Sequence, residues 1–316
     1  MSNIFKRILV TGATGFLGHH IVPALKENFD AEIAAVGRKD YDLLKPGVPE
    51  RMLDEVRPDC VVHLAAKSGG ILDNRLKQAD YYYENMVINT HVFQASFACG
   101  VKKFLSLMGG CAYPAKAASP IDEAQMWNGF PQQESAGYSM AKKMLLVQSW
   151  TYRQQHNFNS IILVPGNVYG EWDNFNLSQA HAIPALIRKC LEASEKQQPF
   201  ITAFGTGRPV RDFVYAGDVA AVIPWFLEKY DSSDPVNISS GSGVTIRELI
   251  NAVKNAVGYS GEVKWDATQP DGQLEKIFDA TRLHELGLNC PTPLEEGLKK
   301  TVAWFIANRD NGNVRL

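Results

Sequence analysis

The residues that most constrain the fold lie near the amino terminus, where RILVTGATGFLGHHIVPAL joins an apolar run to a glycine-rich turn. Three glycines, Gly12, Gly15 and Gly18, separate the apolar run from a helical pattern. A strand, a tight glycine turn and a helix in this order let backbone amides approach a pyrophosphate at the start of the helix. We therefore predict a dinucleotide-binding turn here.

Apolar runs alternate with helical patterns through the first half of the chain. This alternation predicts a parallel sheet covered by helices on both faces, with ligands bound beyond the carboxyl ends of the strands. The predicted strands are 7–11, 32–37, 60–65, 103–108 and 160–165, and the predicted helices are 17–28, 49–56, 83–99 and 138–156.

The pattern loosens after about residue 170, where helices are predicted at 183–193 and 244–257. Residues 211–230 predict a further strand and helix that rejoin the first domain. The predicted fold is α/β, a Rossmann-type doubly wound parallel sheet with a smaller, discontinuous carboxyl-terminal substrate lobe. We assign 1–170 plus about 211–235 to the dinucleotide-binding domain, and about 171–210 plus 236–316 to the smaller lobe.

Charge and cysteine usage exclude several classes of function. A net charge of −2 over 316 residues gives no electrostatic reason to expect nucleic acid or a membrane surface as partner. No apolar stretch approaches the ~18 residues that span a bilayer. The five cysteines are scattered without a CxxC pair, which favours reduced thiols in the cytoplasm and no zinc or other metal site.

The segment AGYSMAK places Tyr138 and Lys142 four residues apart in a predicted helix. Side chains at i and i+4 lie on the same helical face, so the Lys142 ammonium can favour the phenolate form of Tyr138. Such a cation is expected to lower the pKa of the phenol from its ordinary value of about 10 towards the range useful for acid–base catalysis. The alternative interpretation is an ordinary surface helix.

The residues after the second predicted strand bear on the choice of dinucleotide. NAD-specific folds place an acidic residue there, whereas this chain has Arg38 and Lys39, two cations that suit a ribose 2′-phosphate. NADP(H) is therefore the predicted cofactor. Asp40 and Asp42 follow closely and keep NAD(H) open as the less favoured choice.

The ordered motifs TGATGFLG, HLAA, YSMAK and PGNVYG resemble those of the extended short-chain dehydrogenase/reductase family, in its nucleotide-sugar branch. Within that branch AAKSGGI, GCAYP, EWDNF, HAIPALIRK and FGTGRPVRDFVYAGDVA are most similar to the GDP-fucose synthases. The resemblance implies NADPH-dependent epimerisation at C3 and C5 of a GDP-4-keto-6-deoxy sugar, a hexose or a heptose, followed by reduction of the C4 ketone.

The resemblance also implies roles for four catalytic residues. Tyr138 would protonate the C4 oxygen, and Lys142 would hold the nicotinamide ribose and tune the tyrosine. Cys111 and His181 match the acid–base pair of the epimerisation. Inversion requires a proton to leave one face of the sugar and another to arrive on the opposite face, and a thiolate and an imidazole with pKa values near neutrality suit this task.

The same motifs imply the residues that bind cofactor and substrate. The expected cofactor contacts are Gly12, Gly15, Phe16, Leu17, Gly18, Arg38, Lys39, Leu64, Ala65, Ala66, Tyr138, Lys142, Pro165, Asn167 and Val168. The expected substrate contacts are Asn167, Asn174, Arg188, Phe204, Arg211 and Lys276.

Some of these substrate residues have alternative interpretations. Arg211 suits the diphosphate, because a planar guanidinium binds phosphate oxygens in pairs, but it could instead form a salt bridge with Asp212 or Asp218. Phe204 stands where the related enzymes often carry a tryptophan that stacks on the base, and Asn174 could equally form a turn.

One position departs from the family pattern. A serine or threonine normally stands two residues before the cysteine and hydrogen-bonds the substrate oxygen beside the tyrosine, whereas this chain has Gly109. Ser106 is three residues earlier, which places its side chain on the opposite face of a strand. Losing the donor is expected to slow the redox step ~10- to 1000-fold. Another group could replace it, the site could suit a bulkier sugar, or the enzyme could act chiefly as an epimerase.

Three other functions therefore stay open. The chain could be a nucleotide-sugar epimerase without net redox chemistry, a plain C4 reductase, or a non-catalytic nucleotide-binding protein. A homodimer is expected through the helices at 83–99 and 138–156, where Leu146, Val147 and Trp150 recur at helical spacing.

Overall fold

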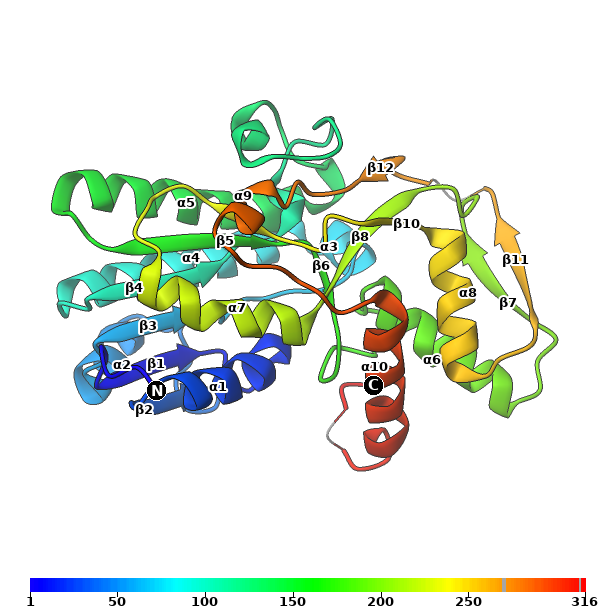
Figure 1. The fold of residues 1–316 in the computed structure, drawn as a ribbon, viewed down its shortest axis with the longest axis horizontal. Coiled ribbons are helices and arrows are strands. Elements are labelled where there is room, and N and C mark those ends of the chain that lie inside the picture. The colour runs from blue at the N-terminus through cyan, green and yellow to red at the C-terminus, as the bar shows by residue number, and fades with distance from the viewer. Residues whose placement is uncertain (269–270, 313) are drawn as a thin grey trace.

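The apolar runs of the first half form one six-stranded, all-parallel sheet in the computed structural model, which describes residues 1–268, 271–312 and 314–316 (Figure 1). Its middle strands are buried along their whole length, as expected for strands covered on both faces. This confirms the predicted Rossmann-type sheet. In spatial order the strands are β2 (Glu32–Val36), β1 (Arg7–Thr11), β3 (Cys60–His63), β4 (Lys103–Leu107), β5 (Ser160–Pro165) and β9 (Val236–Ile238).

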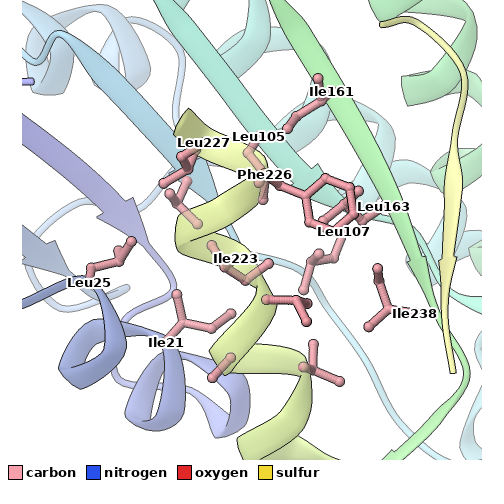
Figure 2. Close-up of a cluster of buried hydrophobic side chains, with 14 of the residues drawn as sticks. Ile21, Leu25, Leu105, Leu107, Ile161, Leu163, Ile223, Phe226, Leu227 and Ile238 are labelled. Atoms are coloured by element: carbon pink, nitrogen blue, oxygen red, sulfur yellow. The ribbon is translucent and has the colours of Figure 1, made fainter. Parts of the chain in front are cut away.

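Successive residues of a strand point to opposite faces of the sheet. Both faces of this sheet are therefore apolar, and helices cover both. Ile8 and Val10 of β1 join one core and Leu9 joins the other. Figure 2 shows the first core, where side chains of α1 and α7 meet those of β4 and β5. The helices are α1 (Phe16–Asn28) and α7 (Ala216–Lys229) on that face, and α2 (Val48–Val56), α4 (Gln78–Ala98) and α5 (Ala136–His156) on the other.

A smaller set of elements lies beyond one end of the central sheet and has a core of its own, built around Phe175, Ile187, Leu249 and Phe305 (Figure 1). Two small sheets and three helices enclose this core. The strands are β6 (Asn167–Tyr169), β7 (Phe200–Phe204), β8 (Val210–Tyr215), β10 (Gly243–Thr245), β11 (Glu262–Asp266) and β12 (Glu275–Lys276). The helices are α6 (Ala182–Glu195), α8 (Ile246–Val257) and α10 (Leu294–Asn308), with the short α3 (Ile71–Leu76) and α9 (Thr281–Glu285) elsewhere.

Two strands belong to a different sheet from the one predicted for them. The strand predicted within 211–230 is β8, which pairs with β6, β10 and β12 in the smaller sheet, whereas the helix α7 packs on α1. Residues 236–238, assigned to the smaller lobe, form β9 beside β5 in the central sheet. A three-residue strand is too short to show a period in the sequence. The boundaries of the two lobes stay a prediction.

The predicted helices begin within five residues of the observed ones, and two of the differences have a clear cause. The helix expected from 83 begins at Gln78. The prediction missed its first turn, because the aspartate and tyrosines there have weak helix propensity. The helix expected from 244 begins at Ile246, because Thr245 caps it through a reciprocal bond with Glu248. No helix of the described residues is long and apolar enough to cross a membrane.

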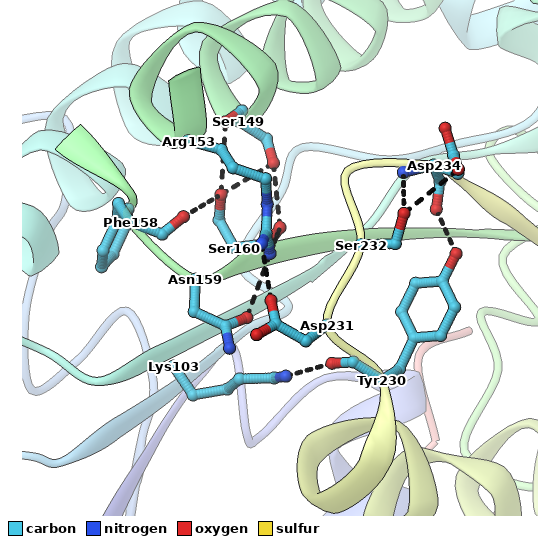
Figure 3. Close-up of polar contacts among 10 residues, drawn as sticks. All are labelled: Lys103, Ser149, Arg153, Phe158, Asn159, Ser160, Tyr230, Asp231, Ser232 and Asp234. Atoms are coloured by element: carbon cyan, nitrogen blue, oxygen red, sulfur yellow. Dashed lines mark hydrogen bonds and ion pairs between the residues drawn. The ribbon is translucent and has the colours of Figure 1, made fainter. Parts of the chain in front are cut away.

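Polar contacts tie the amino-terminal edge of the sheet to the loop that follows α7 (Figure 3). Lys103 of β4 donates a hydrogen bond to the Tyr230 carbonyl. Arg153 of α5 forms an ion pair with Asp231, with 2.5 Å between Nη1 and Oδ1. These contacts stabilise the amino-terminal edge of the sheet. The loops that bear the motif residues lie at the opposite, carboxyl-terminal edge.

Candidate active site

The glycine-rich turn lies at the carboxyl end of β1, directly against the loop after β3. Gly12 has φ +69, and a Cβ at this position would lie 2.7 Å from the Ala65 backbone nitrogen. A Cβ on Gly18 would lie 2.3 Å from the Ala13 carbonyl oxygen, so α1 packs on the turn without side chains between them. α1 begins at Phe16 without a side-chain cap, and its first amides are therefore available to an anion.

The other predicted cofactor residues share this edge because parallel strands end on the same side of a sheet. The segment 64–66 follows β3, Pro165 ends β5, and 167–168 begins β6. The Asn167 side chain is partly committed to the fold, since its Nδ2 donates to the Asp212 carbonyl at 2.7 Å.

The turn after β2 places two cations beside the glycine-rich turn. A Cβ on Gly37 would lie 2.5 Å from Thr14 Oγ1, so the two turns touch. Arg38 is 73% exposed, and only a long contact of 3.7 Å joins its Nε to an Asp42 carboxylate oxygen. Asp40 instead accepts a hydrogen bond from the Gly37 amide at 2.8 Å. This arrangement leaves Arg38, and the exposed Lys39 next to it, accessible to a phosphate.

Tyr138 and Lys142 project from α5 towards the end of β4. Lys142 Nζ donates to the Leu107 carbonyl at 3.1 Å, and burial lowers the pKa of Lys142 to about 8 although the neighbouring Cys111 opposes this shift. Burial, with smaller contributions from Cys111 and Tyr81, raises the pKa of Tyr138. The expectation of a lowered phenol pKa is therefore wrong here, because burial dominates the shift. A phenol that stays protonated at neutral pH is suited to donate a proton.

Gly109 lies between Cys111 and Tyr138. A Cβ on Gly109 would be 3.2 Å from Cys111 Sγ and 3.8 Å from the Tyr138 hydroxyl oxygen. The fully buried Ser106 cannot supply the missing hydroxyl, since its Oγ donates to the His63 carbonyl at 2.8 Å. The end of β4 therefore presents a thiol and a phenol with bare backbone between them.

His181 immediately precedes α6, with its imidazole half-exposed and the buried carboxylate of Asp173 behind it. His181 Nδ1 lies 3.8 Å from Asp173 Oδ1. Burial disfavours the charged imidazole, but the contact with Asp173 outweighs it, and the pKa of His181 is raised. A raised pKa favours the imidazolium, which is the form that can donate a proton.

The loop after β3 connects His181 to Tyr138. The Gly70 amide donates to the Gln179 carbonyl at 2.7 Å, two residues before His181. A Cβ on Gly69 would lie 2.3 Å from the Tyr81 hydroxyl, and the Tyr81 ring is 6.2 Å from the Tyr138 ring. Through these contacts, the loop at 69–70 links the segment before His181 to the ring of Tyr138.

Arg211 and Lys276 are paired residues on the neighbouring strands β8 and β12, so their side chains share one face of the small sheet. Burial lowers the pKa of both, and Cys111 counteracts the shift at Lys276. The alternative salt bridges of Arg211 are not formed. Asp212 accepts from Ser239 and Ser240, and Asp218 accepts from Thr292. Two adjacent, half-buried cations, of which Lys276 interacts with Cys111, suit a diphosphate.

Of the other four predicted substrate residues, three show no contact with this pair among the described residues. Arg188 Nε lies 2.7 Å from Glu192 Oε1, and its Nη1 donates to the Phe175 carbonyl. Phe204 is 57% exposed at the end of β7. Asn174 Oδ1 accepts from the Asn176 amide at 3.0 Å, so this asparagine forms a turn. Their roles in substrate binding stay predictions.

Sequence reasoning missed His63, which lies beneath the site on β3. Its Nδ1 is 2.8 Å from Thr11 Oγ1 and its Nε2 is 3.2 Å from Asn89 Oδ1. Burial, together with the Lys142 charge, lowers the pKa of His63 to about 3. The sequence did contain a signal for a buried histidine, since His63 lies inside the apolar run VVHLAA. The residues that the structure describes hold no cluster of side chains suited to a metal ion.

Comparisons with known proteins agree with this geometry. The model of the NAD dependent epimerase/dehydratase family matches residues 8–239. A GDP-L-fucose synthase of Sinorhizobium fredii is 36% identical over 303 residues, which cover 96% of each chain. A GDP-L-fucose synthetase of Naegleria fowleri bound to NADP superposes with a TM-score of 0.91 at 27% identity, covering 100% of this chain and 98% of that one.

A second solved structure is similar to the same extent. The GDP-6-OMe-4-keto-L-xylo-heptose reductase of C. jejuni superposes with a TM-score of 0.90 at 26% identity, covering 97% of this chain and 99% of that one. The six-stranded parallel sheet of this chain agrees with the fold of these solved structures. The chain belongs to the NAD dependent epimerase/dehydratase family.

Proposed function

We propose that the chain is an NADPH-dependent epimerase/reductase that acts on a GDP-linked 4-keto-6-deoxy sugar, a hexose or a heptose. It would epimerise C3 and C5 and then reduce the C4 ketone. The observation that carries the proposal is the convergence of Cys111, Tyr138 and Lys142 at the end of β4, with His181 across the loop at Gly69. The named activities of the relatives point to the same chemistry.

The residues of the glycine-rich turn fit NADP(H). A Cβ at Gly12 or Gly18 would collide with the neighbouring backbone, so both glycines keep the turn tight, and the uncapped start of α1 offers its amides to a pyrophosphate. Arg38 and Lys39 would bind the 2′-phosphate, and Lys142 would hold the nicotinamide ribose. When bound, the reduced dinucleotide supplies a hydride.

Cys111 and His181 would carry out the epimerisation. The C4 ketone acidifies the protons on C3 and C5, because the enolate left behind is stabilised by resonance. The Cys111 thiolate would take the proton from carbon, and the His181 imidazolium would return a proton to the opposite face. The raised pKa of His181 supports the donor role. Both groups then exchange protons with water, and no net oxidation occurs.

Tyr138 would complete the reduction by donating its phenolic proton to the C4 oxygen as that oxygen gains negative charge. Its raised pKa supports this role, since the phenol is protonated at neutral pH. The Lys142 ammonium, beside the end of β4, would stabilise the tyrosinate that forms.

Arg211 and Lys276 would bind the diphosphate of the substrate, and their shared face on β8 and β12 supports this assignment. Phe204 would stack on the guanine base from its exposed position. The absence of a side chain at Gly109 leaves room beside Tyr138, which supports a heptose as well as a hexose as the sugar.

The proposal also covers the oligomeric state and the cellular compartment. A homodimer would form through α4 and α5, which expose Tyr82, Tyr83 and Trp150. Leu146, expected in the same interface, is 5% exposed and packs in the protein's own core. The five free cysteines support a reducing, cytoplasmic setting.

Steady-state kinetics with GDP-4-keto-6-deoxymannose test the proposal. We expect NADPH to be consumed, and NADH to be consumed at least about tenfold less efficiently, since charge-assisted phosphate bonds contribute ~1.5–3 kcal/mol. An Arg38→Ala/Lys39→Ala variant should lose this preference, and a UDP-linked 4-keto sugar should be a poor substrate. Failure of the unmodified protein to consume either cofactor with the GDP-linked sugar would contradict the proposal.

A further inference from the structure

Asp173 is a buried carboxylate placed directly behind the imidazole of His181. It is 3% exposed, and its Oδ1 lies 3.8 Å from His181 Nδ1 and accepts from the Asn174 amide at 2.7 Å. Its Oδ2 is buried without a hydrogen-bond partner among the described residues. A buried, half-satisfied carboxylate destabilises a fold unless a charged partner offsets the cost, and such groups occur at functional sites.

The last described segment, Val314–Leu316, runs beside the residues that follow Asp173. Asn174 and Arg315 form a parallel β-bridge, and the Phe175 amide donates to the Arg315 carbonyl at 2.9 Å. Arg315 Nη2 reaches back to the Trp172 carbonyl at 3.2 Å. Arg315 therefore holds the chain on both sides of Asp173.

Trp172, immediately before Asp173, is held from the opposite direction. Its ring stacks on His19 of α1, with 3.8 Å between ring centroids and 11° between planes, and it also meets Trp304 of α10. Trp172 has φ +67, a conformation that a bulky residue adopts only when its surroundings impose it. The backbone at Asp173 is thus fixed by contacts from α1, α10 and Val314–Leu316.

We propose that Asp173 is a positioning residue that holds His181 for proton exchange at the sugar, and that Arg315 and Trp172 form a clamp which keeps Asp173 in place. This inference rests on the proposed epimerisation. With Nδ1 held at the carboxylate, Nε2 is the nitrogen that remains to exchange a proton with carbon.

Two charged groups face the imidazole and act in opposite directions. Asp173 favours the imidazolium, whereas Arg315 disfavours it, and the Gly69 backbone adds to the effect of Asp173. Removing the carboxylate charge leaves burial and Arg315 acting against the charged form. The imidazole should then lose its proton at a lower pH.

The near-isosteric variant Asp173→Asn tests the inference through two readouts. Deuterium incorporation at C3 and C5 in deuterated water should slow at least about tenfold, as is usual when a residue that orients a histidine is removed. The alkaline limb of the pH profile of this exchange should move down by about one pH unit. Initial rates of NADP⁺ reduction by GDP-L-fucose, which report hydride transfer alone, should change little. Exchange at the unmodified rate with an unmoved pH profile would overturn the proposal.

An NMR titration of the His181 imidazole gives a readout independent of activity. Its pKa should fall by about one unit in Asp173→Asn, and an unchanged value would contradict the positioning role. If the unmodified protein exchanges no deuterium but its His181 titration responds as stated, the proposed function has failed and the Asp173–His181 pairing has not.

Arg315→Gln tests the clamp, with Arg309→Gln as the matched control, since Arg309 pairs with Glu195, the last residue of α6, and not with the backbone beside Asp173. Exchange should slow in Arg315→Gln and stay unchanged in Arg309→Gln. Equal rates of deuterium exchange in the two variants would contradict the proposed clamp, even if Asp173→Asn behaves as expected.

Discussion

The ring of Phe278 occupies the space that a side chain at position 110 would need. A Cβ on Gly110 would lie 2.2 Å from Phe278 Cζ, and Phe278 itself is 1% exposed. Position 109 differs, because a Cβ there would meet only the ends of the Cys111 and Tyr138 side chains. Of the two adjacent glycines, one is required by packing and the other leaves the site open.

Gly110→Ala should therefore lower the free energy of unfolding by about 1–3 kcal/mol, the usual cost of overpacking a core. Gly109→Ala is the matched control, and it should change the free energy of unfolding by less than about 0.5 kcal/mol, since the Cys111 side chain can move slightly. Urea denaturation measures both. Equal losses in the two variants would contradict the packing of Phe278 on Gly110.

Gly109→Ser should restore a donor beside the Tyr138 hydroxyl. We expect NADPH oxidation with the 4-keto-6-deoxy hexose to rise at least about tenfold, the lower end of what one such donor contributes. Gly109→Ala, which adds bulk without a donor, should give no gain. A serine variant no faster than the alanine variant would show that another group already supplies this hydrogen bond.

The pKa of about 8 at Lys142 predicts a pH dependence for the reduction. Because burial lowers this pKa, the ammonium is present below about pH 8 and is lost above it. NADPH oxidation should therefore fall as the pH rises through 8. Lys142→Arg keeps its charge at all these pH values, so its slower reaction should lack this limb. The kcat/KM profiles of the two proteins measure the effect, and parallel profiles would exclude Lys142 as the titrating group.

His63 predicts a pH dependence for stability. Its folded pKa of about 3 lies below the ordinary value of 6.5, so the unfolded chain binds a proton that the folded chain does not. The His63 contribution is present above pH 6.5 and is lost as the pH falls towards 3. The slope is about 1.4 kcal/mol per pH unit in this window.

Replacing His63 by Gln should remove that slope, whatever it does to the absolute stability. Urea unfolding at several pH values between 4 and 6 compares the two proteins. His156, on the exposed end of α5, supplies the control variant His156→Gln, which should keep the original slope. An unchanged slope in His63→Gln would mean that His63 is protonated in the folded protein.

The sequence predicted most of the central sheet because its strands are buried on both faces and are bounded by turn residues. It missed β9, whose three residues show no period, and α3, which follows two glycines and spans only six residues. Thr245 and Glu248 have the spacing of a capping box, which predicts the start of α8. This pattern would have moved the predicted start of that helix from 244 to Ile246.

For the site, the motifs predicted the residues at the end of β4 but not the contacts around them. The pair of Arg188 and Glu192 has i, i+4 spacing, a signal that the arginine could be committed to its own helix. Asp173 and Arg315 gave no such signal, because they are 142 positions apart (315 − 173) and Arg315 pairs with Asn174, the residue after Asp173, only in the folded chain. The pKa direction at Tyr138 depends on burial, which spacing alone does not reveal.

The central claim is that one site carries out both epimerisation and reduction, with different residues for each. Reaction of GDP-4-keto-6-deoxymannose with NADPH in deuterated water tests it most directly. We expect NADPH loss together with deuterium at C3 and C5 of the recovered sugar, with Cys111→Ser losing the label and Tyr138→Phe losing the NADPH oxidation. Label without NADPH loss, or NADPH loss without label, in the unmodified protein would contradict the claim.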